Sequence, residues 1–483
     1  MQSSQDTRTG SRTDAGHVVV IGGGITGLAA AHRLVGAGVR VTLLESTDRL
    51  GGKLLAGEIE GAPVDLGAES LLARRPEAID LARAVGLGDR LQPPATATAA
   101  LWTRDALRPM PKGHVMGVPA TPEALAGILS PEGVERIAAE RDLPPVELDE
   151  DVAIGAFTAE RLGREVVDRL VEPLLGGVYA GDAYRISMQA AVPQLFAATR
   201  EQGSLLAGVR EVQRRARAQQ QDGPVFLGIE GGVGTLPDAV ADAVLAAGGE
   251  ILHRTPVRAL NRRSDGWEVL LADRKITADA VVLAVPAGPA ATLLAAESPA
   301  AAAELDRIEY ASMALVTFAF RRPELTGLPA GSGFLVPPVD GHTIKASTFS
   351  TQKWQWVDDR SPELFVLRAS IGRHGDEEQL QREDAELIDI ALNDLRRAAG
   401  VTATAVASTV TRWTHGLPQY PVGHPARVGR IHREVAKLPG LALCGAAYDG
   451  VGIPACIAGG QRAADEILAT PTLTQGTVRG AGQ

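Results

Sequence analysis

The glycines near the N-terminus have the spacing of a turn that binds a dinucleotide. Gly22, Gly24 and Gly27 follow a short, β-branched apolar segment at residues 17–21 and precede an Ala-rich helical pattern. At such a site the first glycine permits a tight turn, the second lets the backbone approach a pyrophosphate, and the third lets helix and strand pack closely. The N-terminus of the helix adds amide donors and the positive end of a dipole. The alternative is a glycine-rich turn without a ligand.

Glu45 supports the interpretation as a nucleotide site. It ends a second apolar segment at residues 39–44, where a carboxylate can accept hydrogen bonds from the ribose hydroxyls of the adenosine. Strand, glycines, helix, strand and acid thus occur in the order that the chemistry requires. The other residues of this cradle that we expect to contact the cofactor are Gly23, Ile25 and Thr26.

A second pair of glycines distinguishes FAD from NAD. After Ser46 the chain carries Arg49, then the pair Gly51 and Gly52, and then Lys53. Paired glycines let a loop close over the phosphates, and the two cations offer charge-assisted donors unless they are only solvated surface charges. The arrangement resembles the FAD fingerprint of glutathione reductase followed by the double-glycine motif of the amine oxidase superfamily. A plain NAD domain lacks this extension, so we expect the cofactor to be FAD.

A strand, a turn and a helix near the C-terminus can close over the flavin. An apolar segment at residues 441–444 precedes a glycine-rich turn and a helical pattern in which Pro454 suits the first turn. The amides and dipole at the start of this helix would stabilise negative charge on a reduced flavin. The residues that we expect to contact the flavin here are Gly445, Val451, Gly452 and Ile453. The alternative is an ordinary crossover connection.

Three motifs together indicate a family. Residues 448–457 read YDGVGIPACI, residues 172–182 read EPLLGGVYAGD, and Arg412 and Trp413 precede LPQY at residues 417–420. These motifs resemble those of the oxygen-dependent protoporphyrinogen and coproporphyrinogen oxidases, and the resemblance extends over nearly the whole chain. The second motif is specific, because other relatives of the amine oxidases lack it.

The resemblance implies roles for further residues. Val257 should meet the adenine through its backbone, and Trp413 should pack near the flavin rings unless it is only a core aromatic residue. Gly176 and Gly177 should border a substrate cavity, where a missing side chain admits a flat macrocycle. The residues implied along the edge of the flavin are Gly67, Ala68, Glu69 and Ser70.

The resemblance also implies an activity, the oxidation of coproporphyrinogen III to coproporphyrin III in haem biosynthesis. A hydride passes from a meso carbon to the flavin, a pyrrole nitrogen loses its proton, and oxygen reoxidises the flavin to give hydrogen peroxide. The cofactor carries this chemistry, so we assign no catalytic side chain; Glu69 could act as a base or could hold backbone. The tetracarboxylate coproporphyrinogen is favoured over protoporphyrinogen IX because no interfacial apolar helix is evident.

The anchor for the substrate carboxylates stays open. Several relatives carry an arginine shortly before the position of Trp102, whereas this chain has Thr98, Ala99 and Ala100 there. Each remaining candidate has plain surface charge as its alternative. The candidates are Arg104, Arg108, Lys112, Arg185 and Lys345.

Three other functions remain as alternatives. The first is protoporphyrinogen IX oxidase, and the second is an amine oxidase or carotenoid desaturase on the same fold. An aromatic cage for amines is less favoured, because only five Tyr and five Trp are present. The third is a carrier that binds flavin or porphyrin without catalysis.

The bulk composition limits the possible partners. The 48 basic and 58 acidic residues give a net charge of -10, which disfavours nucleic acid. Cys444 and Cys456 can form no disulfide framework and match no zinc motif, so we expect a reducing cytoplasm and no metal. Residues 1–16 lack a signal-peptide core, and no apolar stretch could span a bilayer. The expected partners are a porphyrinogen and oxygen, with contacts to a membrane surface or to the next haem-pathway enzyme left open.

The order of strands, glycines and helices, together with the family resemblance, predicts an α/β fold. We expect a Rossmann-like FAD-binding domain of the glutathione-reductase type, an α+β substrate domain and a helical insertion. We expect the FAD-binding domain to be discontinuous, from residues 16–92, 223–297 and 408–470. The other expected parts are a disordered leader (1–15), a mostly helical insertion (93–222), a substrate-binding domain (298–407) and a loose tail (471–483). Helices are expected at residues 123–129, 159–174 and 377–398, and residues 210–221 form a solvated helix or a linker.

Overall fold

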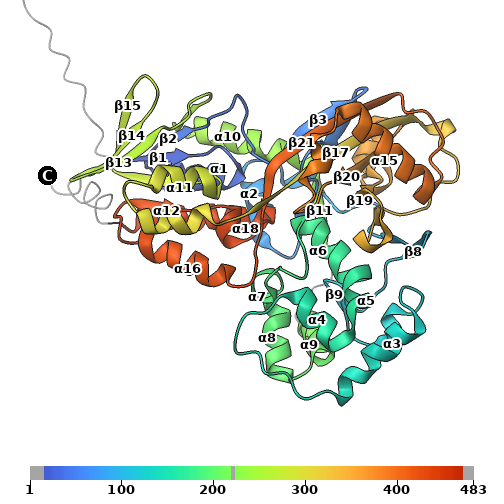
Figure 1. Ribbon diagram of the computed structural model, residues 1–483. Helices are drawn as coiled ribbons and strands as arrows, with labels where there is room; N and C mark the ends of the chain where they lie inside the picture. The colour runs from blue at the N-terminus through green and yellow to red at the C-terminus, as the bar shows by residue number, and fades with distance from the viewer. Residues whose placement is uncertain (1–15, 219–222, 471–483) are drawn as a thin grey trace, which may run out of the picture.

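A computed structural model describes residues 16–218 and 223–470 of the chain (Figure 1). The predicted leader at residues 1–15 and the predicted tail at residues 471–483 lie outside the described residues. No helix in the described ranges combines the length and the apolar character that crossing a membrane requires.

A five-stranded parallel sheet forms the nucleotide-binding half of the molecule. Its strands run in the order β12-β2-β1-β16-β22 and come from three separate stretches of chain. They are β1 (His17–Ile21), β2 (Arg40–Leu44), β12 (Glu250–Leu252), β16 (Ala280–Leu283) and β22 (Leu441–Leu443). Each neighbouring pair is parallel. This sheet and its helices confirm the predicted Rossmann-like fold.

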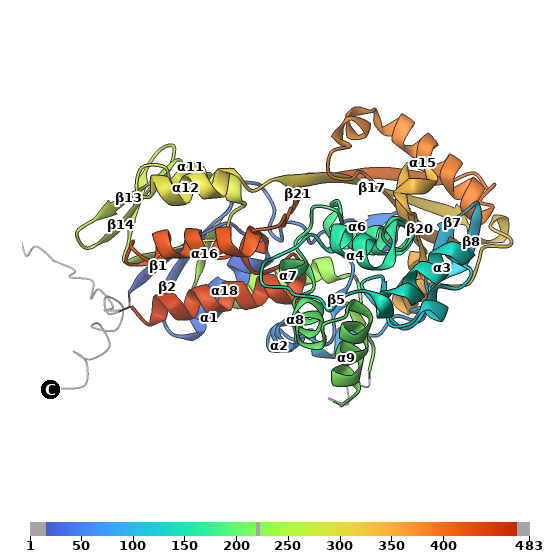
Figure 2. The same cartoon turned by 60° about the horizontal axis from the view of Figure 1, so that its bottom comes forward.

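Both faces of the parallel sheet are buried, which explains why its strands do not alternate polar with apolar residues. In β1, Val18 and Val20 enter one core, whereas Val19 and Ile21 enter another. The first core contains α1 (Ile25–Gly36), α2 (Pro76–Ala84), α10 (Leu236–Ala246) and α18 (Ile453–Leu468). The second contains α11 (Ala287–Leu294), α12 (Pro299–Asp306) and α16 (His424–Val435), and Figure 2 shows the two helical layers on opposite sides of the sheet.

A seven-stranded sheet forms the other half, in the order β21-β17-β20-β19-β18-β7-β8. Its strands are β7 (Ala100–Thr103), β8 (Ala106–Pro109), β17 (Tyr310–Arg321), β18 (Gly333–Leu335), β19 (Ile344–Thr348), β20 (Leu364–Ile371) and β21 (Ala407–Pro418). Helix α15 (Asp384–Ala399) packs on this sheet through Leu387, Ala391 and Leu395. The long strands β17 and β21 connect the two halves of the molecule (Figure 1).

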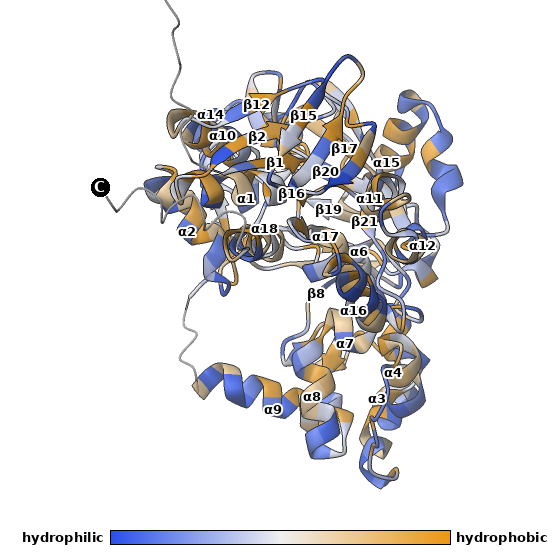
Figure 3. Ribbon diagram, turned by 90° about the vertical axis from the view of Figure 1, so that its left-hand side faces the viewer, coloured by the Kyte–Doolittle hydropathy of each residue, from blue (hydrophilic) through white to orange (hydrophobic). Residues whose placement is uncertain are grey.

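A group of helices lies beside the two sheets and has its own core (Figure 1). Its members are α3 (Pro131–Ala138), α4 (Ile154–Leu162), α5 (Arg164–Val166), η4 (Val167–Val171), α6 (Glu172–Tyr179), α7 (Met188–Ala191), α8 (Pro193–Gln202) and α9 (Leu205–Ala218). Helix α9 buries Leu205 and Val209, while its later residues are mostly polar (Figure 3). The polar run that begins at residue 210 is therefore helical up to Ala218, and residues 219–222 lie outside the described part.

Shorter elements complete the fold. The strands are β3 (Ala56–Ile59), β4 (Ala62–Asp65), β5 (Leu71–Leu72), β6 (Leu91–Gln92), β9 (His114–Val115), β10 (Val118–Pro119), β11 (Phe226–Ile229), β13 (Ala259–Arg263), β14 (Gly266–Leu270) and β15 (Lys275–Ala278). The short helices are α13 (Ser350–Lys353), α14 (Gln355–Arg360) and α17 (Ala446–Asp449).

Three expected helices differ from the observed ones. The predicted helix at residues 123–129 is a 3-10 turn, η2 (Pro122–Leu125), after which Ala126 leaves the helical conformation. The helix expected at residues 159–174 is interrupted, because Gly163 has φ 93° and a π-helical turn follows it. The one expected at residues 377–398 begins as a 3-10 turn, η8 (Glu377–Gln381), before α15.

Part of the expected insertion is not helical. Strands β7 and β8, at the start of residues 93–222, join the edge of the seven-stranded sheet through the pairing of β7 with β18. The alternation of Leu101 and Trp102 into separate cores shows why a strand forms here. The domain boundaries themselves stay a prediction.

Candidate active site

The three cradle glycines lie between β1 and α1 and differ in what surrounds them. A Cβ atom on Gly22 would lie 2.5 Å from the carbonyl oxygen of Ala284, and one on Gly27 would lie 1.9 Å from that of Gly22. A Cβ atom on Gly24 would meet no atom within 4 Å. Gly22 and Gly27 are therefore required by packing, whereas the open side of Gly24 suits the close approach of a pyrophosphate.

The start of α1 offers free amide donors at this open side. Gly24 is the N-cap of α1, and no side chain caps the helix. The double-glycine loop lies against the same turn, because the amide of Gly51 donates to the carbonyl of Gly23 at 2.9 Å. A Cβ atom on Gly52 would lie 3.3 Å from the Cα of Gly24. The structure thus brings the two predicted phosphate loops together.

Glu45 joins the cradle to the turn after β2. Its Oε2 accepts from the amide of Gly23 at 2.8 Å, and its Oε1 accepts from the amide of Thr47 at 2.8 Å and from the hydroxyl of Ser46 at 3.1 Å. A carboxylate oxygen has more than one acceptor site, so Glu45 can hold this turn and still accept from a ribose hydroxyl.

The two cations of the loop have different surroundings. Arg49 donates to the carbonyls of Leu50 at 3.0 Å and Gly52 at 2.6 Å, and its guanidinium lies 5.5 Å from the ring centre of Trp413. It therefore braces its own loop against β21. Among the described residues, no carboxylate contributes to the surroundings of Lys53. Burial lowers the pKa of Lys53, so an anionic ligand would favour its charged form.

The segment predicted to border the flavin meets Lys53 and Trp413. A Cβ atom on Gly67 would lie 2.3 Å from the carbonyl oxygen of Lys53 and 3.1 Å from the ring of Trp413. The amide of Ala68 donates to the same Lys53 carbonyl at 3.2 Å, and the Trp413 indole donates to the carbonyl of Leu66 at 3.1 Å. Trp413 is therefore fixed beside this segment and is not an isolated core residue.

Glu69 is held by two cations. Its Oε2 lies 2.6 Å from Nη2 of Arg368, and it also pairs with Lys353, whose ammonium donates to the hydroxyl of Ser70 at 3.2 Å. Burial opposes ionisation of Glu69, but the charges of Arg368 and Lys353 hold its pKa below the usual value. An ionised carboxylate that is paired twice is a poor proton acceptor. The ion-pair partners of the Glu69 carboxylate in the described residues are these two cations, and its role as a base or as a support for backbone stays a prediction.

Arg368 links this carboxylate to the flavin-edge segment. Its Nη1 donates to the carbonyl of Asp65 at 2.5 Å and to that of Gly67 at 3.0 Å. Sequence reasoning missed both Arg368 and Lys353. A signal for Arg368 exists, because it is the charged residue inside the apolar strand β20. No comparable signal marks Lys353, which lies on the short helix α13.

The C-terminal segment reaches the cradle as expected. Gly445, with φ 140°, follows β22, and Gly452 is the N-cap of α18, which no side chain caps. Val451 packs on the core of the helical group, so the segment lies between that group and α18. A Cβ atom on Gly460 of α18 would lie 2.2 Å from the carbonyl of Thr26, which shows how closely α18 and α1 pack.

Val257 lies in the connection between β12 and β13. Its neighbours are fixed, since the amide of Thr255 donates to the carbonyl of Glu45 and that of Arg258 donates to Leu270, both at 2.8 Å. The backbone of Val257 itself has no backbone partner within the part of the chain that the structure describes. This leaves it available for the adenine contact that the resemblance implies.

Gly176 and Gly177 lie on α6, near the predicted substrate side. Gly176 is buried, yet a Cβ atom on it would meet nothing within 4 Å, and one on Gly177 would meet Leu335 only at 3.7 Å. Open space therefore lies beside α6. Among the candidate anchors, Lys345 reaches this place, with Nζ 3.5 Å from the carbonyl of Gly176.

The other candidate anchors are ion-paired, partly buried or exposed. Arg104 pairs with Glu165, and Arg185 pairs with Glu309 at 2.9 Å. Arg108 is partly buried on β8, and Lys112 is exposed. The structure therefore brings Lys345, and none of these four, to the carbonyl of Gly176.

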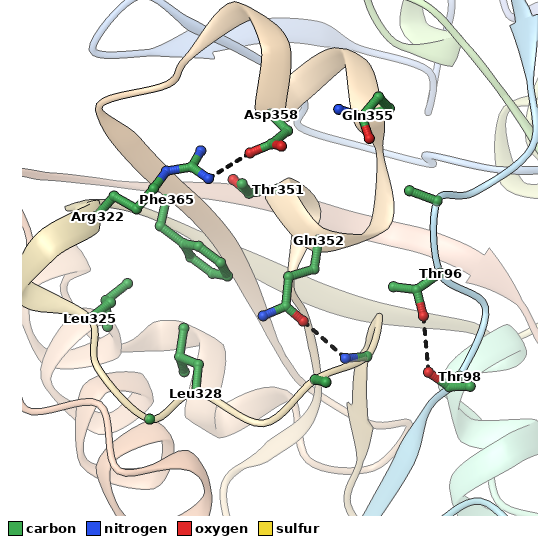
Figure 4. Close-up of a pocket in the computed structure, with 14 residues that line it drawn as sticks. Thr96, Thr98, Arg322, Leu325, Leu328, Thr351, Gln352, Gln355, Asp358 and Phe365 are labelled. Atoms are coloured by element: carbon green, nitrogen blue, oxygen red, sulfur yellow. Dashed lines mark hydrogen bonds and ion pairs between the residues drawn. The ribbon is translucent and has the colours of Figure 1, made fainter.

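A pocket of about 560 Å³ lies elsewhere, between α13, α14 and residues 325–331 (Figure 4). Its polar groups are paired: Arg322 lies 2.6 Å from Asp358, and the amide of Gly331 donates to Gln352 at 2.9 Å. No residue predicted to bind cofactor or substrate lines it. It is therefore not the candidate active site.

Comparison with known proteins covers nearly the whole chain. The family described as flavin containing amine oxidoreductase matches residues 25–468. A coproporphyrinogen III oxidase of Mycobacterium tuberculosis is 36% identical over 460 residues, which cover 93% of this chain and 96% of that protein. One from Bacillus subtilis is 32% identical over 466 residues, which cover 94% of this chain and 98% of that protein.

A solved structure extends this similarity to three dimensions. A candidate protoporphyrinogen oxidase from Exiguobacterium has a TM-score of 0.83 and 33% identity, covering 94% of this chain and 98% of that one. The family match confirms the predicted FAD cofactor and the predicted class of enzyme. The open side of Gly24, the uncapped helix α1 and the unpaired Lys53 fit such a cofactor. This chain belongs to the family of flavin-containing amine oxidoreductases.

Proposed function

We propose that this protein is an FAD-dependent oxidase that converts coproporphyrinogen III to coproporphyrin III, with oxygen as electron acceptor and hydrogen peroxide as second product. The similarity to coproporphyrinogen III oxidases over more than nine-tenths of the chain carries the proposal. A match confined to the parallel sheet would support only the cofactor. This match also includes the helical group and the seven-stranded sheet, which hold the predicted substrate side.

When bound, FAD accepts two electrons in each oxidation of the macrocycle and transfers them to oxygen. The chain supplies the binding groups and the position. Lys53 and the start of α1 would meet the pyrophosphate, Glu45 the ribose, and Val257 the adenine. The start of α18 and the segment from Gly67 to Ser70 would meet the flavin ring.

The substrate side suits a flat molecule. Open space beside Gly176 leaves room next to α6. Positioning of a meso carbon against the flavin and exclusion of water are the contributions that we assign to the protein. Glu69 is already ion-paired, so the proton of the pyrrole nitrogen leaves to another acceptor.

The tetracarboxylate substrate is favoured over protoporphyrinogen IX. In the described part of residues 93–222, Val178 is the single exposed large hydrophobic residue, so no cluster of such residues favours a lipid-borne substrate there. The cytoplasmic location and the contact with the next haem-pathway enzyme stay predictions.

The experiment is porphyrin fluorescence in air with the purified, FAD-loaded protein, using coproporphyrinogen III beside protoporphyrinogen IX. We expect fast turnover of the first and slow turnover of the second, with hydrogen peroxide formed. The reverse preference would make the protein a protoporphyrinogen oxidase. Turnover of neither, with FAD still bound, would exclude the proposed function and direct the search to amines and polyenes.

A further inference from the structure

Lys345 is a buried cation without a carboxylate partner. It lies on β19 and is 5% exposed. Its Nζ contacts the carbonyl of Gly176 at 3.5 Å and the sulfur of Met313 at 3.9 Å, both weak partners for an ammonium. No carboxylate lies within 4.0 Å of it in the described ranges. Such a group is costly in the folded protein unless a ligand pairs with it.

Arg373 is a second cation at the same place. The carbonyl of Val336 accepts from Arg373 Nη2 at 3.2 Å, and the amide of Val336 donates to the carbonyl of Lys345 at 2.9 Å. One residue of backbone thus connects the two cationic residues. Arg373 also has no carboxylate within 4.0 Å among residues 16–218 and 223–470.

Glu172, at the start of α6, is one of two carboxylates whose charge acts on Arg373, and Asp376 is the other. The Glu172 carboxylate accepts from the amide of Ala183 at 2.6 Å, and it forms no ion pair within 4.0 Å with either cation in the described ranges. Burial raises the pKa of Glu172 to about 7, and the charge of Arg373 opposes this shift. Burial likewise lowers the pKa of Lys345 to about 7, with Arg373 adding to the shift. Asp376 also acts on Arg373, but neither carboxylate lies within 4.0 Å of either cation in the described ranges. The two cations therefore lack a direct carboxylate partner, which an anionic ligand would supply.

Lys345 also lies near the segment that we expect to border the flavin, residues 67–70. Met313, which Lys345 contacts, pairs in register with Trp413 across β17 and β21. Trp413 in turn packs on the segment that begins at Gly67. The open space beside Gly176 adjoins the Lys345 ammonium. A molecule in that space would lie next to the residue whose carbonyl the Lys345 ammonium contacts.

We propose that Lys345 and Arg373 form a buried binding site for one carboxylate of the substrate, next to Gly176. The inference rests on the proposed function and specifies what recognises a propionate side chain of the macrocycle. A carboxylate there makes charge-assisted hydrogen bonds to both cations and fixes the rotation of the ring in its own plane. Lys345 and Arg373 are positioning residues, and the flavin chemistry does not pass through them.

The test is the dissociation constant of coproporphyrin III, the product, measured by fluorescence titration of the FAD-loaded protein. Lys345→Met removes the charge and keeps an unbranched side chain that is one atom shorter. We expect it to weaken binding by about tenfold or more, with a smaller effect for Arg373→Gln. The tetramethyl ester of coproporphyrin, which has no carboxylates, should bind wild type and both variants alike.

Lys437→Met is the matched control, since Lys437 is exposed and its ion-pair partner in the described part of the chain is Glu434. If Lys345→Met unfolds the protein, the titration with Arg373→Gln serves as the test, because Arg373 is a half-buried loop residue whose replacement should disturb folding less. Unchanged binding of coproporphyrin III by a folded variant would overturn the carboxylate site while leaving the oxidase activity intact. Wild type that binds coproporphyrin III through Lys345 but oxidises no porphyrinogen would instead overturn the proposed function alone.

Discussion

Nη2 of Arg368 lies 2.6 Å from Oε2 of Glu69, inside the segment that borders the predicted flavin edge. The same guanidinium holds the carbonyls of Asp65 and Gly67. One arginine therefore fixes both the carboxylate and the backbone around it. We therefore expect Glu69 to position this segment and not to act as a general base.

Replacing Glu69 by Gln leaves Arg368 and Lys353 buried without their anion. Breaking a buried pair in this way costs about 3–5 kcal/mol of stability. We expect thermal unfolding at a clearly lower temperature and weaker FAD binding, whereas Glu132→Gln on exposed α3 should change neither. A loss of kcat of about a hundredfold with an unchanged melting temperature would instead make Glu69 a general base.

Alanine substitutions at Gly24 and Gly27 should have different effects, because Gly24 faces the predicted ligand and Gly27 faces protein atoms. An alanine at Gly24 meets no protein atom, so Gly24→Ala should fold normally. We expect it to lose about 1–3 kcal/mol of FAD binding, because the added methyl occupies the space of the pyrophosphate. Gly27→Ala should lower the stability of the apoprotein itself, since its Cβ would strike the Gly22 carbonyl. Calorimetry of FAD binding and thermal melts of the apoprotein measure the two effects, and equal FAD affinity in Gly24→Ala and wild type would contradict the assignment.

Filling the space beside α6 should impair oxidation of the substrate and leave FAD binding unchanged. For Gly176→Leu we expect kcat/KM for coproporphyrinogen III to fall by about tenfold or more, with FAD content unchanged. Gly36→Leu is the control, because Gly36 is an exposed helical residue that also has open space beside it. Full activity of Gly176→Leu would place the macrocycle elsewhere.

Lys345 should also affect how stability depends on pH in the absence of substrate. Its pKa falls from 10.5 to about 7 on burial, so the unfolded chain binds more protons between these values and stability rises with pH in that window. The pKa of Glu172 rises from 4.5 to about 7 on burial, so between these values the folded protein binds more protons and stability falls as the pH rises. In Lys345→Met, stability should no longer rise with pH above about pH 7, whereas the dependence due to Glu172 should remain. The variant should be more stable than wild type by about 1 kcal/mol or more at pH 7. Denaturant melts at several pH values test this, and identical pH profiles for variant and wild type would refute it.

The sequence predicts the parts of the site that local chemistry determines. Gly22, Gly24 and Gly27 act within one turn, and Glu45 ends the next strand, so spacing along the chain is sufficient to identify them. The fold follows from the same short-range order of strand, glycines and helix. The breaks in the predicted helices at residues 123–129 and 159–174 depend on packing that no local pattern shows.

The rest of the site depends on long-range contacts. Lys353 meets Glu69 across 284 positions, and nothing near either residue marks the other. Arg373 reaches Lys345 only because loop and strand meet at Val336. Lys345 could be named as a candidate anchor from its charge, but its burial and its closeness to Gly176 required the folded structure.

The most direct measurement is anaerobic mixing of the FAD-loaded protein with coproporphyrinogen III, followed through the visible absorbance of the flavin. We expect the flavin to be reduced and porphyrin to appear together, and readmission of oxygen to restore oxidised flavin with release of hydrogen peroxide. A flavin that stays oxidised with coproporphyrinogen III, but is reduced by an amine, would contradict the proposed function.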